Sequence, residues 1–486
     1  MGQNCEVSIT ARRALILLAG LAMTVSLAAC ALEEPPEPVR GKAVSRGVET
    51  RTERQGRLTE RDSDRADPLF GGVAVADEPS AVLVAREILE QGGNAADAAA
   101  ALYFALSVTY PAAAGLGGGG VCLVRDAQER TVESIAFLAR SPRGGGAVAI
   151  PGNVRGFALL QSRYGTRPWA AIVGPAERLA ATGFPLSRAG ARQLADAAPL
   201  IAASPSLQAG FARPDGERPR ELDRVTRVEL AGTLALIRSL GVNGFYAGQT
   251  ARALVAEASR AGGALSLDDL RDDRPEVAPA QMLSMPAAAA VAVPAPTAGA
   301  GVFAAALWRD LEKTGPAELA EAARRTAVSL GVTENIDRDF GSTAFATVDG
   351  AGGAVACAVT MNGAFGLGHV AEGTGIVLSA NPQQAARGIA SAFLMPVIVT
   401  GANGSRIVFS GAGAGAPKGA AAIQHAARSA LAGPDAVAAA LAASPADARS
   451  PAHAIACPEG QAASACSPVA GPRGDGMGIV AAGSGS

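Results

Sequence analysis

The sequence has few of the residues that bind metals or nucleic acids. Its 486 residues include only three histidines, which are far apart, and neither a CxxC nor an HExxH motif occurs, so no metal site is expected. Aromatic residues make up 4% and the net charge is −2, which gives no reason to expect a nucleic-acid partner. Beyond the N-terminus no stretch looks membrane-spanning. No cofactor is predicted.

The N-terminus has the parts of an export signal. Arg12 and Arg13 precede an apolar run at 14–25, and Leu27-Ala28-Ala29 stands directly before Cys30. This order indicates a bacterial lipoprotein signal over 1–29 with lipidation at Cys30; an ordinary signal peptide with a chance cysteine is the alternative. The paired arginines fit twin-arginine export poorly. No aspartate follows Cys30, which favours a periplasmic protein anchored to the outer membrane through this lipid.

Residues 30–67 are predicted to form a disordered tether. A Pro/Glu-rich stretch is followed by mixed charge with few apolar residues, which cannot bury enough surface to fold. A coil of this length spans about 35 Å, enough to hold a domain away from a membrane.

Four other cysteines follow the tether. Cys457 and Cys466 are nine residues apart in a Gly/Ala/Pro-rich tail, and the periplasm would allow them to pair. Cys122 and Cys357 lie in apolar, strand-like runs and are predicted to be buried thiols.

The remaining pattern changes from helical to strand-like along the chain. Helices are expected at 80–91, 94–110, 155–164, 169–182, 187–197 and 250–261. Strands are expected at 73–76, 121–125, 344–349, 354–361, 376–379, 397–400 and 407–410. A helix-rich first half and a strand-rich second half predict an α+β layered domain and not a doubly wound sheet.

Glycines at 115–120 lie between an expected helix and an expected strand. A phosphate-binding loop runs from strand to helix, so the order here argues against a nucleotide site. Close packing of the loop against another backbone explains the glycines better.

Ser342 begins a strand-like segment in the middle of the chain, after Gly341 and before Thr343. A self-cleaving amidase needs a hydroxyl residue at such a point, because cleavage leaves a hydroxyl nucleophile beside its own α-amine, a base at neutral pH. Thr360 and Asn362 follow eighteen and twenty residues later. The alternative is a buried Ser-Thr pair that opens an ordinary strand.

Several stretches in one order resemble the γ-glutamyltransferases (glutathione hydrolases), which are N-terminal-nucleophile hydrolases. They lie at 91–98, 115–120, 151–156, 163–169, 183–187, 244–248 and 262–270, and the resemblance extends over roughly 70–425. It implies a four-layer αββα sandwich and a precursor that cleaves itself. The large-subunit-like region would be 68–341 and the small-subunit-like region 342–486.

The resemblance also implies roles for individual residues. Cleavage would fall before Ser342, which matches the nucleophile position that is normally threonine, with Thr343 as second choice. Thr360 would orient the nucleophile and Asn362 would contact the substrate. Ala414 and Gly415 match the turn whose backbone N–H groups form the oxyanion hole. The implied partner is a small amide or peptide substrate.

Other positions depart from the family pattern. Leu138 stands where the family has the arginine for the substrate carboxylate. Arg140 is two residues further on, which along a strand keeps it on the same face about 7 Å away, and it is the candidate for this substrate contact. Gln384 replaces the aspartate for the α-amino group, and Ala392 and Phe393 replace paired serines. Losing these charges removes several kcal/mol of zwitterion binding. The sequence therefore leaves two hypotheses: an amidohydrolase with a less polar acyl substrate, or a degenerate homologue that binds without catalysis.

Overall fold

The structure is a computed structural model that describes residues 69–213, 215–298, 300–332, 336, 338–382, 393–458 and 461–483. The predicted signal, the tether, Cys30, Gln384 and Ala392 lie outside these residues. The membrane anchor, and the effects of Gln384 and Ala392 on substrate binding, therefore stay predictions. In the part of the chain that is described, no helix is long and apolar enough to cross a membrane.

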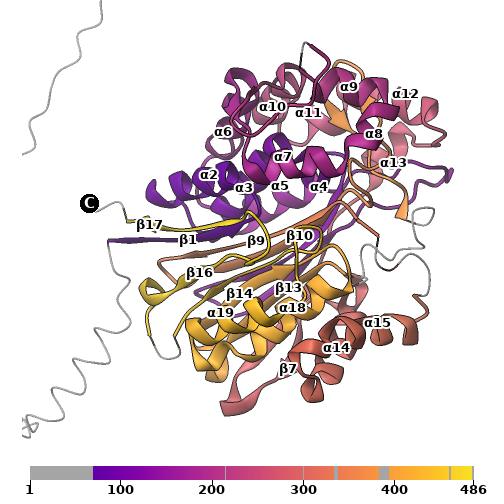
Figure 1. The fold of residues 1–486 in the computed structure, drawn as a ribbon. Helices are drawn as coiled ribbons and strands as arrows, with labels where there is room; N and C mark the ends of the chain where they lie inside the picture. Colours follow the sequence, from indigo (N-terminus) through magenta and orange to yellow (C-terminus); the bar gives the residue numbers. More distant parts are fainter. Residues whose placement is uncertain are drawn as a thin grey trace, which may run out of the picture. The chain divides into compact units, whose positions relative to one another are not determined.

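Two antiparallel sheets form the centre of the folded body (Figure 1). Seven strands in the described residues make the first sheet, in the order β17 (Met477–Ala482), β1 (Phe70–Ala76), β9 (Ser342–Asp349), β10 (Ala354–Thr360), β2 (Gly119–Arg125), β3 (Val132–Phe137) and β6 (Glu276–Pro279). Six described strands make the second, in the order β16 (Ser467–Val469), β15 (Ala452–Ala456), β14 (Ile407–Gly413), β13 (Met395–Thr400), β8 (Ala290–Val293) and β7 (Gln281–Ser284).

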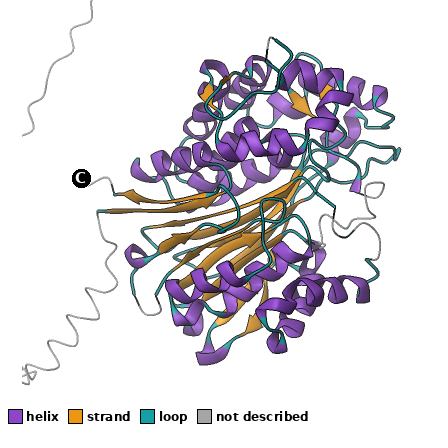
Figure 2. Cartoon of the chain, in the orientation of Figure 1, coloured by secondary structure: helices purple, strands orange, loops and turns teal. Residues whose placement is uncertain are grey.

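Helices cover the outer face of each sheet, so the layers run helix, sheet, sheet, helix (Figures 1 and 2). The first sheet carries α2 (Pro79–Glu90), α3 (Ala95–Thr109), α4 (Pro111–Ala114), α5 (Asn153–Tyr164), α6 (Trp169–Thr182), α7 (Arg188–Asp196), α8 (Ala198–Ala203), α9 (Pro205–Phe211), α10 (Val228–Leu240), α11 (Asn243–Tyr246), α12 (Gly248–Arg260) and α13 (Leu267–Asp272). The second carries α14 (Ala300–Asp310), α15 (Leu319–Ser329), α18 (Pro417–Arg428) and α19 (Pro434–Ala443). Two-residue strands pair β4 (Phe184–Pro185) with β5 (Arg224–Val225), and β11 (Val370–Ala371) with β12 (Ile376–Val377). The predicted α+β sandwich of four layers is confirmed.

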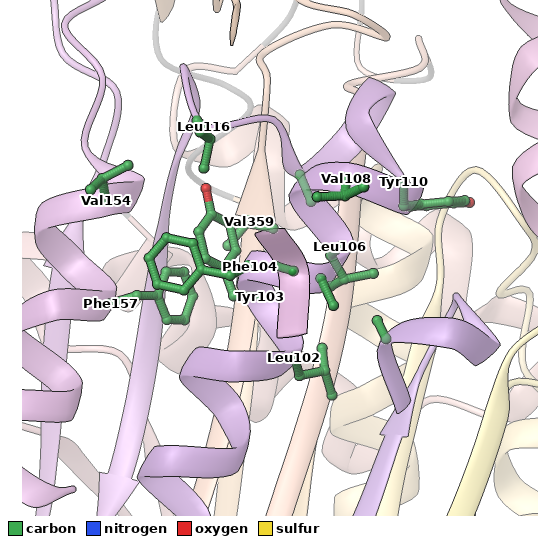
Figure 3. Close-up of a cluster of buried hydrophobic side chains, with 14 of the residues drawn as sticks. Leu102, Tyr103, Phe104, Leu106, Val108, Tyr110, Leu116, Val154, Phe157 and Val359 are labelled. Carbon is green, nitrogen blue, oxygen red and sulfur yellow. The ribbon is translucent and has the colours of Figure 1, made fainter. Parts of the chain in front are cut away.

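Side chains alternate between two cores along β9. Phe345 belongs to the core under the helices, with its ring centroid 6.0 Å from that of Phe157. Ala344 and Ala346 face the second sheet, where alanine and valine predominate. Figure 3 shows part of the helix-side core, in which Tyr103 stacks on Phe157 at 3.9 Å. The scarce aromatic residues are thus concentrated outside the narrow space between the sheets.

The local predictions hold well for the long elements. α2 and α3 occupy the expected ranges, and Asn94 forms a capping box with Asp97 at the start of α3. The glycine loop packs closely as expected, because a Cβ on Gly117 would lie 2.1 Å from the Val377 carbonyl oxygen. The strand expected at 376–379 is shorter, since β12 has only two residues.

The four described cysteines form two disulfides. Cys457 pairs with Cys466, as the sequence suggested. The prediction of buried thiols at Cys122 and Cys357 is wrong, because these residues are directly opposite each other on β2 and β10 and are bonded. Sequence spacing could not reveal this pairing, since 235 residues separate the two cysteines.

Candidate active site

Ser342 and Thr360 face each other at the end of the first sheet. They are paired residues of β9 and β10, and both are buried. The Ser342 hydroxyl donates to Thr360 Oγ1 at 2.9 Å, and Thr360 Oγ1 donates to the Phe340 carbonyl at 2.9 Å. Thr360 Oγ1 also accepts the backbone N–H of Asn362 at 2.9 Å. Thr360 therefore fixes the direction of the Ser342 hydroxyl, as its predicted role requires.

Gly341, the residue before Ser342, is held through both its carbonyl and its N–H. The Gly341 carbonyl accepts the Met361 N–H at 2.9 Å, and the Gly341 N–H donates to Asp339 Oδ1 at 2.8 Å. Gly341 has φ +55°, and a Cβ there would lie 2.2 Å from the Gly363 carbonyl oxygen. Glycine is therefore required at this position. Burial raises the pKa of Asp339, and the bond from Gly341 partly opposes that shift.

Asn362 lies close to the peptide bond before Ser342, but its side-chain amide is already hydrogen-bonded. Its φ is +57°, in the left-handed region that asparagine tolerates. The side-chain amide donates to the Ala380 carbonyl at 2.9 Å. In this state, Asn362 shapes the turn behind Ser342, and its predicted contact with substrate stays a prediction.

A second buried network begins at Thr343, on the opposite face of β9 from Ser342. The Thr343 hydroxyl donates to Asp77 Oδ2 at 2.6 Å, and His453 Nε2 lies 2.8 Å from Asp77 Oδ1. The Gly471 N–H donates to His453 Nδ1 at 3.0 Å, which places the imidazole proton on Nε2, toward Asp77. Thr343 is thus engaged with Asp77, whereas the Ser342 hydroxyl is bonded to Thr360.

The cavity beside Ser342 is small, about 30 Å³, and strongly charged. Gly341 and Asp339 also line it, so the segment before the nucleophile occupies part of the space. Its charged lining residues are Asp77, Arg192, Asp196, Asp339, Arg449 and Asp475. Arg192 pairs with Asp475 and Arg449 pairs with Asp196. Burial, followed by the charge of Asp77, raises the pKa of the neighbouring Tyr110.

The expected oxyanion pair lies near the nucleophile strand, but one of its donors is engaged. Ala414 is in the same buried cluster as Ala344. Its N–H donates to the Pro451 carbonyl at 3.0 Å, and the oxyanion role of the two amides stays a prediction. Gly415 follows with φ +92°, tight against the backbone of Arg449.

Arg140, the candidate for binding the substrate carboxylate, is absent from this cavity. Leu138, at the family's arginine position, packs against the buried cluster of Leu394 and Ala414. Arg140 pairs with Asp273 and Glu276 instead, and it is not among the residues that line the Ser342 cavity. The expectation that Arg140 follows the strand on the same face is wrong, because β3 ends at Phe137.

Three further residues of this region escaped the sequence analysis. Asp77 and His453 are buried polar residues of this region, and Asp339 is half-buried beside the cavity at Ser342. The available signals were weak: an aspartate directly after an apolar strand, another two residues before the scissile bond, and one of only three histidines.

Solved structures with the same architecture include a cephalosporin acylase from Bacillus halodurans. It is 20% identical, with a TM-score of 0.68, and the match covers 85% of this chain and 96% of that one. This likeness shows the fold. The chain therefore shares the layered fold of this acylase, and Ser342 lies at the start of a central strand of the first sheet.

The sequence comparisons find similarity to one family over part of the chain. The family model for gamma-glutamyltranspeptidase matches residues 81–314. Scoloptoxin SSD14 of Scolopendra dehaani is 33% identical over 233 residues, which are 43% of this chain and 40% of the toxin. The glutathione hydrolase proenzyme of Bacillus subtilis is 30% identical over 223 residues, 41% of this chain and 38% of the proenzyme. The resemblance to this family is confirmed over residues 81–314, and the chain spans about two fifths of the length of the curated relatives it matches.

Proposed function

We propose that this protein is a γ-glutamyltransferase-like amidohydrolase or acyltransferase that activates itself by cleavage before Ser342. The observation that carries the proposal is the chain of hydrogen bonds through Thr360, which directs the Ser342 hydroxyl at the end of β9. The substrate class is a γ-glutamyl or related amide. The names of the relatives support this reaction class.

The first step of the proposed cleavage uses groups of the chain itself. Ser342 Oγ attacks the Gly341 carbonyl carbon, the C–N bond breaks, and the hydroxyl proton passes to the released amine. The Met361 N–H lies on the oxygen where negative charge develops. Water then hydrolyses the resulting ester, which leaves a Gly341 carboxylate and a free Ser342 hydroxyl and α-amine. That amine serves as the base for later turnovers.

Intact mass and N-terminal sequencing of the purified protein test the cleavage. We expect a fragment that begins at Ser342 in the wild type and a single uncut chain for Ser342→Ala. Samples must be reduced first, because the Cys122–Cys357 bond joins the two sides of the scissile bond. A wild-type chain that stays uncut under native expression would contradict the proposal.

The same spectra test the proposed location. We infer an outer-membrane lipoprotein in the periplasm from the signal at 1–29, with Cys30 as the first mature residue. The larger fragment should then begin at Cys30 and carry a lipid mass that disappears in Cys30→Ser. A larger fragment that begins elsewhere contradicts this location without affecting the cleavage result.

A second candidate is a binding lipoprotein without turnover. The observation in its favour is the apolar packing of Leu138 at the position where the family holds the substrate carboxylate. Cleavage at Ser342 without hydrolysis of any amide would support this candidate over the enzyme.

The loss of the arginine predicts a change in substrate preference. We expect kcat/KM for a γ-glutamyl anilide to be no higher than for a simple acyl anilide of the same length. A bidentate arginine–carboxylate contact contributes roughly 1.5–3 kcal/mol, so its absence costs about 10- to 100-fold for the charged substrate. A clear preference for the γ-glutamyl anilide would mean that another residue holds the carboxylate.

A further inference from the structure

A second cavity lies in the helical layer and shares no lining residue with the cavity at Ser342. Residues of α9, α10, α12 and β11 line it, and its volume is about 580 Å³. Cavities of roughly 300–1,000 Å³ are typical of small-molecule sites. The proposed amidase reaction makes no use of this space.

Arg227 is a buried charge on the wall of this cavity. Its residue is only 9% exposed, and its guanidinium lies 3.7 Å from the Phe211 ring centroid. Nε donates to the Val108 carbonyl at 3.3 Å and Nη1 donates to the Gly210 carbonyl at 2.7 Å. No described carboxylate forms an ion pair with Arg227, and no described residue accepts from its Nη2. A buried guanidinium without a counter-charge is costly.

Burial without a counter-charge also affects the acidity of this group. Desolvation lowers the pKa of Arg227 to about 9. An anion beside the guanidinium would oppose that shift.

The start of α10 adds a second feature that attracts an anion. Arg227 is the N-cap residue of this thirteen-residue helix, and no side chain caps its first N–H groups. Val228, Glu229 and Leu230, the first three helical residues, line the cavity. The positive end of the helix dipole therefore coincides with the buried guanidinium.

The remaining wall limits the kind of anion. Phe211, Leu230 and Val370 supply apolar surface. The lining also holds three carboxylates, those of Glu229, Glu257 and Glu372. Glu257 is partly neutralised by Arg260. A dianion such as phosphate would meet these carboxylates, whereas a monoanion with an apolar body meets the arginine and the apolar wall.

We propose that this cavity binds a small monocarboxylate with an apolar body, with the carboxylate on Arg227 and the start of α10. The site is separate from Ser342. Binding to it does not depend on cleavage or turnover.

Calorimetry with N-acetyl-phenylalanine and its neutral amide tests the site on the purified protein. We expect the acid to bind with a Kd of about 1 mM or tighter. The neutral amide and inorganic phosphate should each bind at least about tenfold more weakly. Equal binding of acid and amide, tighter binding of phosphate, or no binding of the acid would overturn the proposal.

A matched pair of variants locates the binding. Val228 is 70% exposed at the first turn of α10, and Val302 is 53% exposed at the first turn of α14, away from the cavity. Val228→Asp supplies a carboxylate beside Arg227 and should weaken binding of the acid about tenfold. Val302→Asp makes the same chemical change and should leave binding unchanged. Equal effects of the two variants would place the acid elsewhere and overturn the proposal.

Val228→Asp and Val302→Asp are expected to fold equally well, so a difference in binding between them does not come from destabilisation. An acidic residue in the first turn of a helix is favourable in both variants. Neither change touches Ser342, so failure of the proposed cleavage leaves this test intact.

Discussion

Replacing Thr360 by valine is expected to slow cleavage before Ser342 by about 100- to 1,000-fold, since the group that directs the nucleophile is lost. The Thr360 hydroxyl accepts from Ser342 and from the Asn362 N–H, and it donates to the Phe340 carbonyl. Valine keeps the volume and leaves these buried groups without a partner, so we also expect a stability loss of roughly 1–3 kcal/mol. The cleaved fraction over time, followed by mass spectrometry after reduction, gives the rate.

Thr347→Val is the matched control for this experiment. Thr347 is a buried threonine on β9, the strand next to that of Thr360, and its hydroxyl donates to the Ala95 carbonyl at 2.8 Å, away from Ser342. We expect a stability loss of about 1 kcal/mol and an unchanged cleavage rate. If both variants slow cleavage equally, the effect of Thr360 comes from general destabilisation and the directing role is wrong.

Removing the Cys122–Cys357 bond is expected to give the largest stability loss of any single cross-link in the chain's described part. In the uncut chain, which the Ser342→Ala background provides, the bond closes a loop of 235 residues, and the chain-entropy estimate for that length is about 5 kcal/mol. The variant Cys122→Ala/Cys357→Ala should therefore show a much lower denaturation midpoint in urea. Circular dichroism against urea concentration measures it.

The Cys457–Cys466 bond provides the comparison. It closes only nine residues, for which the same estimate is about 2.5 kcal/mol. The corresponding double alanine variant should lose roughly half as much. A larger loss from the short loop would show that the bonds act through native packing and not through the unfolded chain.

The sequence was sufficient to predict what depends on local pattern. Alternating side chains placed β9 and β10 and brought Ser342 to the end of a strand, and the glycine loop at 115–120 was correctly expected to pack against backbone. Such features follow from periodicity and backbone sterics, which short windows of sequence carry.

Features that depend on contacts between distant segments could not be predicted from the sequence. Cys122 meets Cys357 only because β2 pairs with β10, and Asp77 meets His453 only because the two sheets face each other. The misplacement of Arg140 has a similar origin, since Asp273 and Glu276 come from a segment that the sequence did not connect with it.

The segment that ends at Gly341 has a consequence for the timing of activity. Phe340 is fully buried, its carbonyl accepts from Thr360, and Gly341 lines the space beside Ser342. On the proposed function, the uncut chain is its own inhibitor, because this segment occupies the place where a substrate must enter. The protein would be a zymogen whose inhibitor is released by the reaction that creates its catalytic amine. Synthesis could then proceed inside the cell without exposing its amides to a working enzyme.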